Sequence, residues 1–169
     1  MEIGISVGAV SYVELVLGDN RGNQIVLPFD TWKSLMQKRM EIERLLQSPQ
    51  TPLWIRDLTI EVVKMSDSEI VKITLHGGNS LYMKPSTILY LFDLGKCIDH
   101  MYFWLCQNTH IVNEKFKQFV NVLQRNNIID LCDVAKTICE SDAFDSESLV
   151  DCELLTCAVN DIFHDACNK

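Results

Sequence analysis

The stretch "GNQIVLPFDTW" (22–32) has a counterpart 56 residues later in "GNSLYMKPSTI" (78–88). Each begins with a Gly-Asn pair, continues as a short apolar run and ends in a Thr beside a large apolar residue. Gly-Asn pairs favour tight turns, because both residues tolerate positive φ, so each pair predicts a turn that leads into a strand. The two stretches suggest that one strand–helix unit is written twice.

The sequence around each stretch predicts the same order of elements. The β-branched runs "EIGISVG" and "SYVELVLGD" come before the first, and "LTIEVVKM" and "EIVKITLH" before the second. A helix over 31–47 with Asp30 as its N-cap follows the first, and a helix over 87–105 capped by Ser86 follows the second. When the first half is shifted by 56 residues onto the second, the apolar residues of the strand and of the helix fall at equivalent positions. Coincidence is the alternative, since any two strand–strand–helix segments look alike.

The last third of the chain predicts helices alone. Apolar positions at helical spacing favour one helix with its apolar face over 112–123 and a second with its apolar face over 128–139. A third helix is expected to begin at a cap formed by Asp145 or Ser146 and to have its apolar face over 155–166. The expected fold class is α+β, with two tandem β-β-β-(β)-α repeats that form a pseudo-dimer with curved antiparallel sheets. An all-helical C-terminal extension follows. The expected domains are 1–50, 53–107 and 108–169.

Charge is unevenly distributed along the 169 residues, whose net charge is −8. Residues 1–125 hold 13 basic and 13 acidic residues, while residues 126–169 hold 2 basic and 10 acidic ones. The body is therefore neutral and the tail acidic, unlike the strongly basic domains of most nucleic-acid binders. No apolar run approaches the ~20 residues that span a bilayer, and the N-terminus lacks a basic signal-peptide region. The expected setting is the nucleus, the cytoplasm or both, without a membrane.

The residue types that carry most enzyme chemistry form no recognisable signature. The seven cysteines are expected to be reduced, buried thiols, since their spacing lacks the paired pattern of a structural zinc site. The four histidines have no catalytic partner pattern, and no phosphate-binding glycine loop is present. Trp32, Trp54 and Trp104 are expected in the core. The sequence therefore predicts a non-enzymatic protein without metal or cofactor.

Two stretches carry a resemblance to a known superfamily. "GNQIVLPFDTWKSLMQKRMEIERLL" resembles the last strand, acidic cap, Trp-Lys pair and helix of a positive-cofactor-four domain. "NSLYMKPSTILYLFDLGKCIDHMY" resembles the end of a Pur repeat, as found in Pur-alpha-like proteins. The plant Whirly proteins belong to the same superfamily. The resemblance covers roughly residues 1–106 and implies a single-chain pseudo-dimer that binds single-stranded nucleic acid on its strand faces.

Strand alternation predicts which side chains would serve that function. The outward faces should carry cations for phosphates and aromatic rings for bases, and the candidates are Lys72, His76, Tyr82, Lys84, Tyr12 and Arg21. The first sheet is the poorer surface, because Glu14, Val16 and Val26 also point outward there. The chain is expected to bind single-stranded DNA or RNA in transcription or nucleic-acid metabolism. The alternative is a protein-interaction adaptor of the same fold within a larger complex, with a partner on the acidic C-terminal helices or on the weakly charged first sheet. Further association of two chains is left open.

Overall fold

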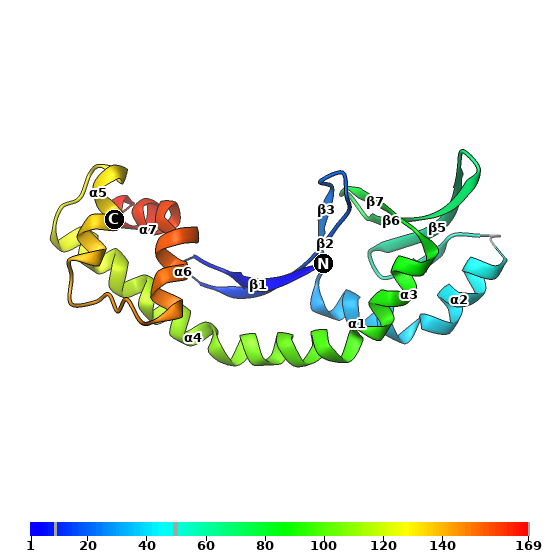
Figure 1. Ribbon diagram of the computed structural model, residues 1–169, viewed down its shortest axis with the longest axis horizontal. Coiled ribbons are helices and arrows are strands. Elements are labelled where there is room, and N and C mark those ends of the chain that lie inside the picture. Colours follow the sequence, from blue (N-terminus) through cyan, green and yellow to red (C-terminus); the bar gives the residue numbers. More distant parts are fainter. Residues whose placement is uncertain (9, 49–50, 169) are drawn as a thin grey trace. The chain divides into compact units, whose positions relative to one another are not determined.

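The computed structural model describes residues 1–8, 10–48 and 51–168 (Figure 1). These residues form a mixed α+β structure with two antiparallel sheets, as the sequence predicts. The strands are β1 (Glu2–Ser6), β2 (Tyr12–Gly18), β3 (Gln24–Val26), β4 (Leu53–Ile55), β5 (Leu58–Met65), β6 (Ser68–Leu75) and β7 (Ser80–Met83). The helices are α1 (Phe29–Gln37), α2 (Arg39–Gln47), α3 (Pro85–Asp93), α4 (Gly95–Arg125), α5 (Leu131–Cys139), α6 (Leu149–Cys157) and α7 (Val159–Cys167).

Both sheets follow the order of the sequence, β1-β2-β3 in the first and β4-β5-β6-β7 in the second. The hairpins β2–β3 and β6–β7 turn near the two predicted Gly-Asn pairs. Gly22 of the first pair has φ +83°, whereas in the second turn Gly77, one residue before the pair, has φ +75°. A side chain would strain the backbone at these angles, so glycine fits both turns. The edge strands β3 and β7 contact each other, and Asn79 Nδ2 lies 3.5 Å from the Gln24 carbonyl oxygen.

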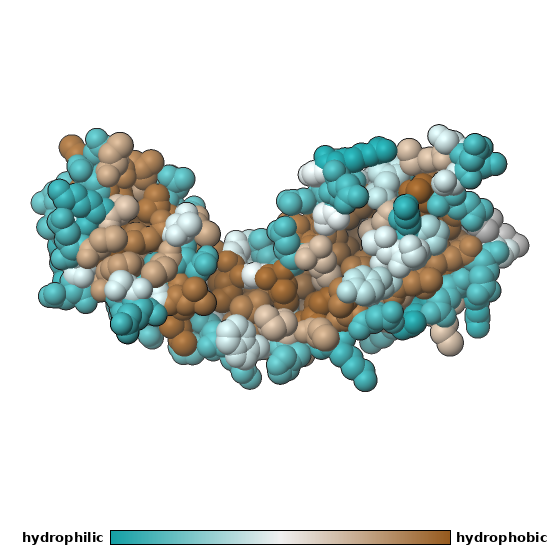
Figure 2. Space-filling view, viewed as in Figure 1, coloured by the Kyte–Doolittle hydropathy of each residue, from teal (hydrophilic) through white to brown (hydrophobic). Residues whose placement is uncertain are grey.

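The chain forms two compact units. Unit 1 consists of residues 1–4 and 14–103, and unit 2 of residues 5–13 and 104–169. The core of unit 1 joins the inner faces of both sheets to α1–α3 and the start of α4, with Trp32, Ile60 and Leu81 fully buried. Figure 2 shows hydrophilic side chains along the outer margin of each unit. The expected segments 1–50 and 53–107 thus lie largely within one unit, and α4 continues across position 107.

The two long helices predicted in the body are each broken in two. The helix expected over 31–47 is α1 and α2, which meet at Lys38, and the helix expected over 87–105 is α3 and the first part of α4, which meet at Leu94. The Lys38 N–H bonds to the carbonyl three residues back instead of four, which tightens the last turn. The break lets residues on both sides, Leu35 and Ile42, be fully buried in the same core.

The expected caps of these helices are also wrong. Asp30 lies within the first turn of α1, and Pro28 takes the N-cap position. Ser86 lies inside α3, whose N-cap is Lys84 and whose first residue is Pro85. Proline suits the first helical position, because its fixed φ is helical. Its lack of an N–H costs nothing there, since an N–H at this position would have no acceptor within the helix.

A regular displacement relates the elements of the two halves. The helices α1 and α3 begin at 29 and 85 and end at 37 and 93, so both ends are 56 residues apart. The breaks at Lys38 and Leu94 have the same separation, as do the starts of β2 and β6 and of β3 and β7. Only β4 has no counterpart among the described strands of the first half.

Unit 2 consists of the second part of α4, α5, α6 and α7 with their connecting loops and the segment 5–13, and its helices differ from the prediction in extent. The segment expected as a helix over 112–123 is the second half of α4, and the third expected helix is α6 and α7, separated at Ala158. Ser148 caps α6, in place of Asp145 or Ser146. The Ser148 hydroxyl accepts the Asp151 N–H and donates to the Asp151 carboxylate, whereas neither alternative lies next to the first turn.

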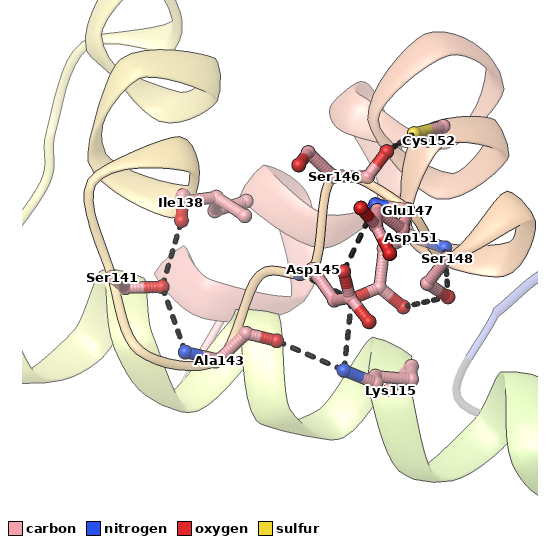
Figure 3. Close-up of polar contacts among 10 residues, drawn as sticks. All are labelled: Lys115, Ile138, Ser141, Ala143, Asp145, Ser146, Glu147, Ser148, Asp151 and Cys152. Carbon is pink, nitrogen blue, oxygen red and sulfur yellow. Dashed lines mark hydrogen bonds and ion pairs between the residues drawn. The ribbon is translucent and has the colours of Figure 1, made fainter.

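A buried carboxylate ties α4 to the loop before α6 (Figure 3). Asp151 is 0% exposed and accepts hydrogen bonds from Lys115 Nζ at 2.8 Å, the Asp145 N–H at 2.9 Å and the Ser148 hydroxyl at 3.0 Å. Burial raises the pKa of Asp151, but these three donors outweigh it, and the pKa lies below its ordinary value. Lys115 also donates to the Ala143 carbonyl at 2.9 Å, so the network fixes the loop on α4.

Candidate nucleic-acid interface

The outward face of the second sheet carries the predicted residues Lys72 and Tyr82 as neighbours. Strand register pairs Lys72 of β6 with Tyr82 of β7 on one side and with Glu61 of β5 on the other. The side chains on either side of them along β6 alternate to the core, where Val71 and Ile73 are fully buried. The alternation therefore places Lys72 and Tyr82 on one solvent-facing surface, as the sequence predicts.

The Lys72 ammonium is held by an acidic neighbour. Lys72 Nζ lies 2.7 Å from Glu61 Oε1, and this hydrogen bond, with the attraction between the two charges, raises the pKa of Lys72. The side chain stays charged, but a carboxylate already occupies the position that a phosphate would take. Lys72 is consequently less available to a phosphate than its sequence context indicates, because a phosphate would have to displace Glu61.

A groove in unit 1 brings three of the predicted residues together. It has a volume of about 710 Å³ and lies between the β2–β3 turn, the β5–β6 turn and the end of β7. Arg21 lines it from the β2–β3 turn, and Tyr82 and Lys84 from the end of β7. Arg21 and Lys84 are exposed and Tyr82 is half-buried. Two cations and one aromatic ring from segments 60 residues apart thus share one open cavity.

The β2–β3 turn that presents Arg21 is fixed by an aspartate. The Asp19 carboxylate accepts the backbone N–H of Arg21 at 2.8 Å and of Asn23 at 3.0 Å, and the Asn23 side-chain amide at 2.8 Å. The Asn23 side chain is the main cause of the lowered pKa of Asp19. Asp19 therefore holds the turn in one conformation, although its negative charge offsets part of the positive charge in the groove.

The remaining predicted residues lie outside this groove. His76 is exposed in the β6–β7 turn, at the opposite end of β6 from Ser68 and Ile70, which line the groove. Its backbone N–H donates to the Asp57 carbonyl at 2.7 Å. Tyr12 is exposed, but it begins β2 in the segment that belongs to unit 2. The structure therefore gathers Arg21, Tyr82 and Lys84, with Lys72 beside Tyr82.

The sequence pattern did not indicate that Trp54 lies on the surface. It was expected in the core with Trp32 and Trp104, and only Trp32 is there, at 0% exposure. Trp54 is 67% exposed and Trp104 is 52% exposed. Alternation along β4 explains Trp54, because Leu53 and Ile55 on either side of it pack inward. The short run "LWI" between two turns was the only signal in the sequence.

The cysteines were also expected in the core, and this prediction is wrong. All seven are free thiols, and six are exposed while Cys152 is half-buried. In α5 the helical periodicity placed Cys132 and Cys139 on the apolar side, but the buried residues of this helix are Val134 and Ile138. Within the described residues, no group of three or more His, Cys, Asp or Glu side chains is arranged to hold a metal ion.

Comparisons with known proteins give no further guide to the groove. No family model, no curated protein and no solved structure matches the chain. A search of the described helices finds none with the length and hydrophobicity needed to cross a bilayer. The groove is therefore interpreted from its own chemistry.

Proposed function

We propose that the protein binds single-stranded DNA or RNA in the groove lined by Arg21, Tyr82 and Lys84. The observation that carries the proposal is the convergence of two exposed cations and an aromatic ring in one open cavity. Arginine and lysine neutralise phosphates, and an aromatic ring stacks on any unpaired base, so these groups bind single strands with little sequence preference.

The charge of the groove sets the expected strength of binding. Asp19 lies in the same groove as Arg21 and Lys84, and Glu61 holds Lys72. The net positive charge is consequently small, and binding should be weak at physiological salt and stronger at low salt, where phosphate attraction is less screened. This balance fits a neutral body and differs from the strongly basic surface of most nucleic-acid binders.

The displacement of 56 residues supports a tandem repeat as the origin of the groove. We propose that β1–α2 and β5–α4 are two copies of one sheet–helix unit that form a pseudo-dimer, as in the positive-cofactor-four, Whirly and Pur-alpha-like superfamily. The equal lengths of α1 and α3 and the matching breaks after them support this relationship. The outward face of the first sheet offers Val16 and Val26, so the two copies would contribute unequally, the first through Arg21 alone. A role in transcription or nucleic-acid metabolism is part of the same proposal.

Fluorescence anisotropy with labelled single-stranded DNA and RNA tests the function. The Arg21→Ala/Lys84→Ala variant should reduce the slope of log affinity against log salt by about one to two, because up to two phosphate contacts are lost. The charge-matched control is Arg44→Ala/Lys96→Ala, since both residues are exposed on helices outside the groove. The control should keep the slope of the unmodified protein. Absence of binding at low salt, or an equal effect of both variants, would contradict the proposed site.

A second function, protein interaction through unit 2, is favoured by a separate observation. Unit 2 contains most of the acidic excess, and it exposes Ile129, Leu131 and Leu149. Apolar side chains beside acidic ones suit a basic amphipathic partner. Calorimetric titration with a lysine- and leucine-rich helical peptide, compared between the unmodified chain and an Ile129→Asp/Leu149→Asp variant, tests this function. Equal affinity of the two proteins for the peptide would exclude these side chains as the contact.

A further inference from the structure

The outward face of the second sheet has a second aromatic residue far from the groove. Strand register pairs Trp54 of β4 with Thr59 of β5, and Thr59 with Thr74 of β6. Thr74 in turn pairs with Ser80 of β7. Because paired residues point to the same face, Trp54 shares its face with Lys72 and Tyr82. At 67% exposure, the indole is largely free of protein contacts.

The residues between the two aromatic residues are polar. Thr74 Oγ1 and Ser80 Oγ lie 2.9 Å apart and share a hydrogen bond, and the half-buried Thr59 continues the row toward Trp54. The Glu61–Lys72 ion pair lies in the adjacent row. Hydroxyl groups both donate and accept, so they can bind phosphate, sugar or base edges without large side chains blocking the surface.

The spacing suits a short single strand that crosses the β-strands. Neighbouring strands are ~4.8 Å apart, so the three intervals from β4 to β7 separate the aromatic residues by about 14 Å, and Tyr82 lies two residues, about 7 Å, beyond the row of Trp54. The combined separation is roughly 16 Å by these standard spacings. At about 3.4 Å per stacked nucleotide, it corresponds to roughly five nucleotides.

We infer that Trp54 is a second stacking site for nucleic acid, and that the bound strand runs across the second sheet from the groove at β7 to the edge at β4. This inference rests on the proposed function, because Tyr82 and the cations of the groove hold one end of the strand. The indole holds the other end, and the threonine and serine hydroxyls contact the nucleotides between them. An exposed ring on a sheet face is the feature that sequence-tolerant single-strand binding requires.

Two oligothymidylates of different length test the path. An octamer is long enough to reach both aromatic residues, whereas a trimer in the groove is too short to reach Trp54. Trp54→Ala should weaken octamer binding about 5- to 150-fold, the loss of one stacked base, and leave trimer binding unchanged. Trp54→Phe, which keeps an aromatic face, should retain most of the octamer affinity. Tyr82→Ala should weaken both oligonucleotides.

Tryptophan fluorescence gives an independent readout of the same contact. In a Trp104→Phe background, Trp54 is the exposed tryptophan and Trp32 is fully buried. The octamer should quench this emission and the trimer should not, because stacking places a base against the indole. The Trp104→Phe variant also serves as the control in the binding assay, where it should bind like the unmodified protein.

The outcomes separate this inference from the proposed function. If Trp54→Ala binds the octamer like the unmodified protein while Tyr82→Ala does not, the path across the sheet is overturned and the groove stands. If Trp54→Ala weakens trimer and octamer binding equally, the path is also overturned, since the loss would not depend on whether the oligonucleotide is long enough to extend to Trp54. If neither oligonucleotide binds the unmodified protein at low salt, the proposed function and the path fail together.

Discussion

Replacement of Lys115 by Met should destabilise unit 2 by removing the cation that pairs with the fully buried carboxylate of Asp151. Asp151 would keep the hydrogen bonds from Asp145 and Ser148 but lose the charge that offsets its burial. Breaking a buried ion pair costs about 3–5 kcal/mol of unfolding free energy. Because the Lys115 side chain is 26% exposed and partly solvated, we expect a cost of about 3 kcal/mol for this pair. Methionine keeps the length of the aliphatic stem, so little packing is lost.

The pH dependence of this variant has a definite sign. In the unmodified protein the pKa of Asp151 is lowered by folding, so its contribution to stability is complete above the unfolded value of about 3.9 and is lost as the pH falls further. Without Lys115, burial should raise the folded-state pKa of Asp151 above the unfolded value. Protonation then stabilises the folded variant as the pH falls through that raised pKa. The stability gap between the two proteins should therefore narrow from pH 7 toward pH 4.

Hydrogen exchange measured by mass spectrometry localises the effect, because α5, α6 and α7 should lose protection while β5–β7 keep theirs. The matched control is Lys117→Met on the same helix, which changes the net charge equally at an exposed position. Both variants lose one positive charge, so the difference in stability between them excludes the effect of the changed net charge. A Lys115→Met protein as protected as the Lys117→Met control at pH 7, or a gap that widens on acidification, would refute the account of Asp151.

Three further outcomes are expected. Gly77→Ala should lower stability by roughly 1 kcal/mol or more in urea denaturation, because φ is +75° there, while Gly78→Ala should have little effect. Trp32→Ala should cost about 3–5 kcal/mol in the same assay, since the ring is fully buried and its N–H lies 3.3 Å from Asp99; a cost below 1 kcal/mol would contradict its place in the core. A thiol reagent should modify the exposed cysteines of the native protein faster than the half-buried Cys152, and among them Cys132 and Cys157 should react more slowly, because Asp130 raises the pKa of Cys132 and burial raises the pKa of Cys157. Protection of all seven thiols until denaturant is added would show that these helix faces are covered.

Local chemistry determined much of the fold. The hairpins at Gly22 and Gly77 follow from glycine's access to positive φ, and the alternation in "IVKITLH" fixed the outward face of β6. The α+β class, the helical last third and the burial of Trp32 follow from the same short-range patterns. The helix limits were less predictable, because a pattern with three- and four-residue steps continues through the breaks at Lys38 and Leu94.

Packing between distant segments decided the rest. No local signal places Arg21 in one groove with Lys84, because the two segments meet through tertiary contacts, among them that of β3 with β7. Nor does a local signal show that Glu61 holds Lys72, because the register of two strands sets that pair. Burial itself depends on which surfaces meet, so apolar residues such as Trp54 can satisfy a sequence pattern and still face water. The sequence named the candidate side chains, and tertiary contacts determined which of them share a surface and which are already neutralised.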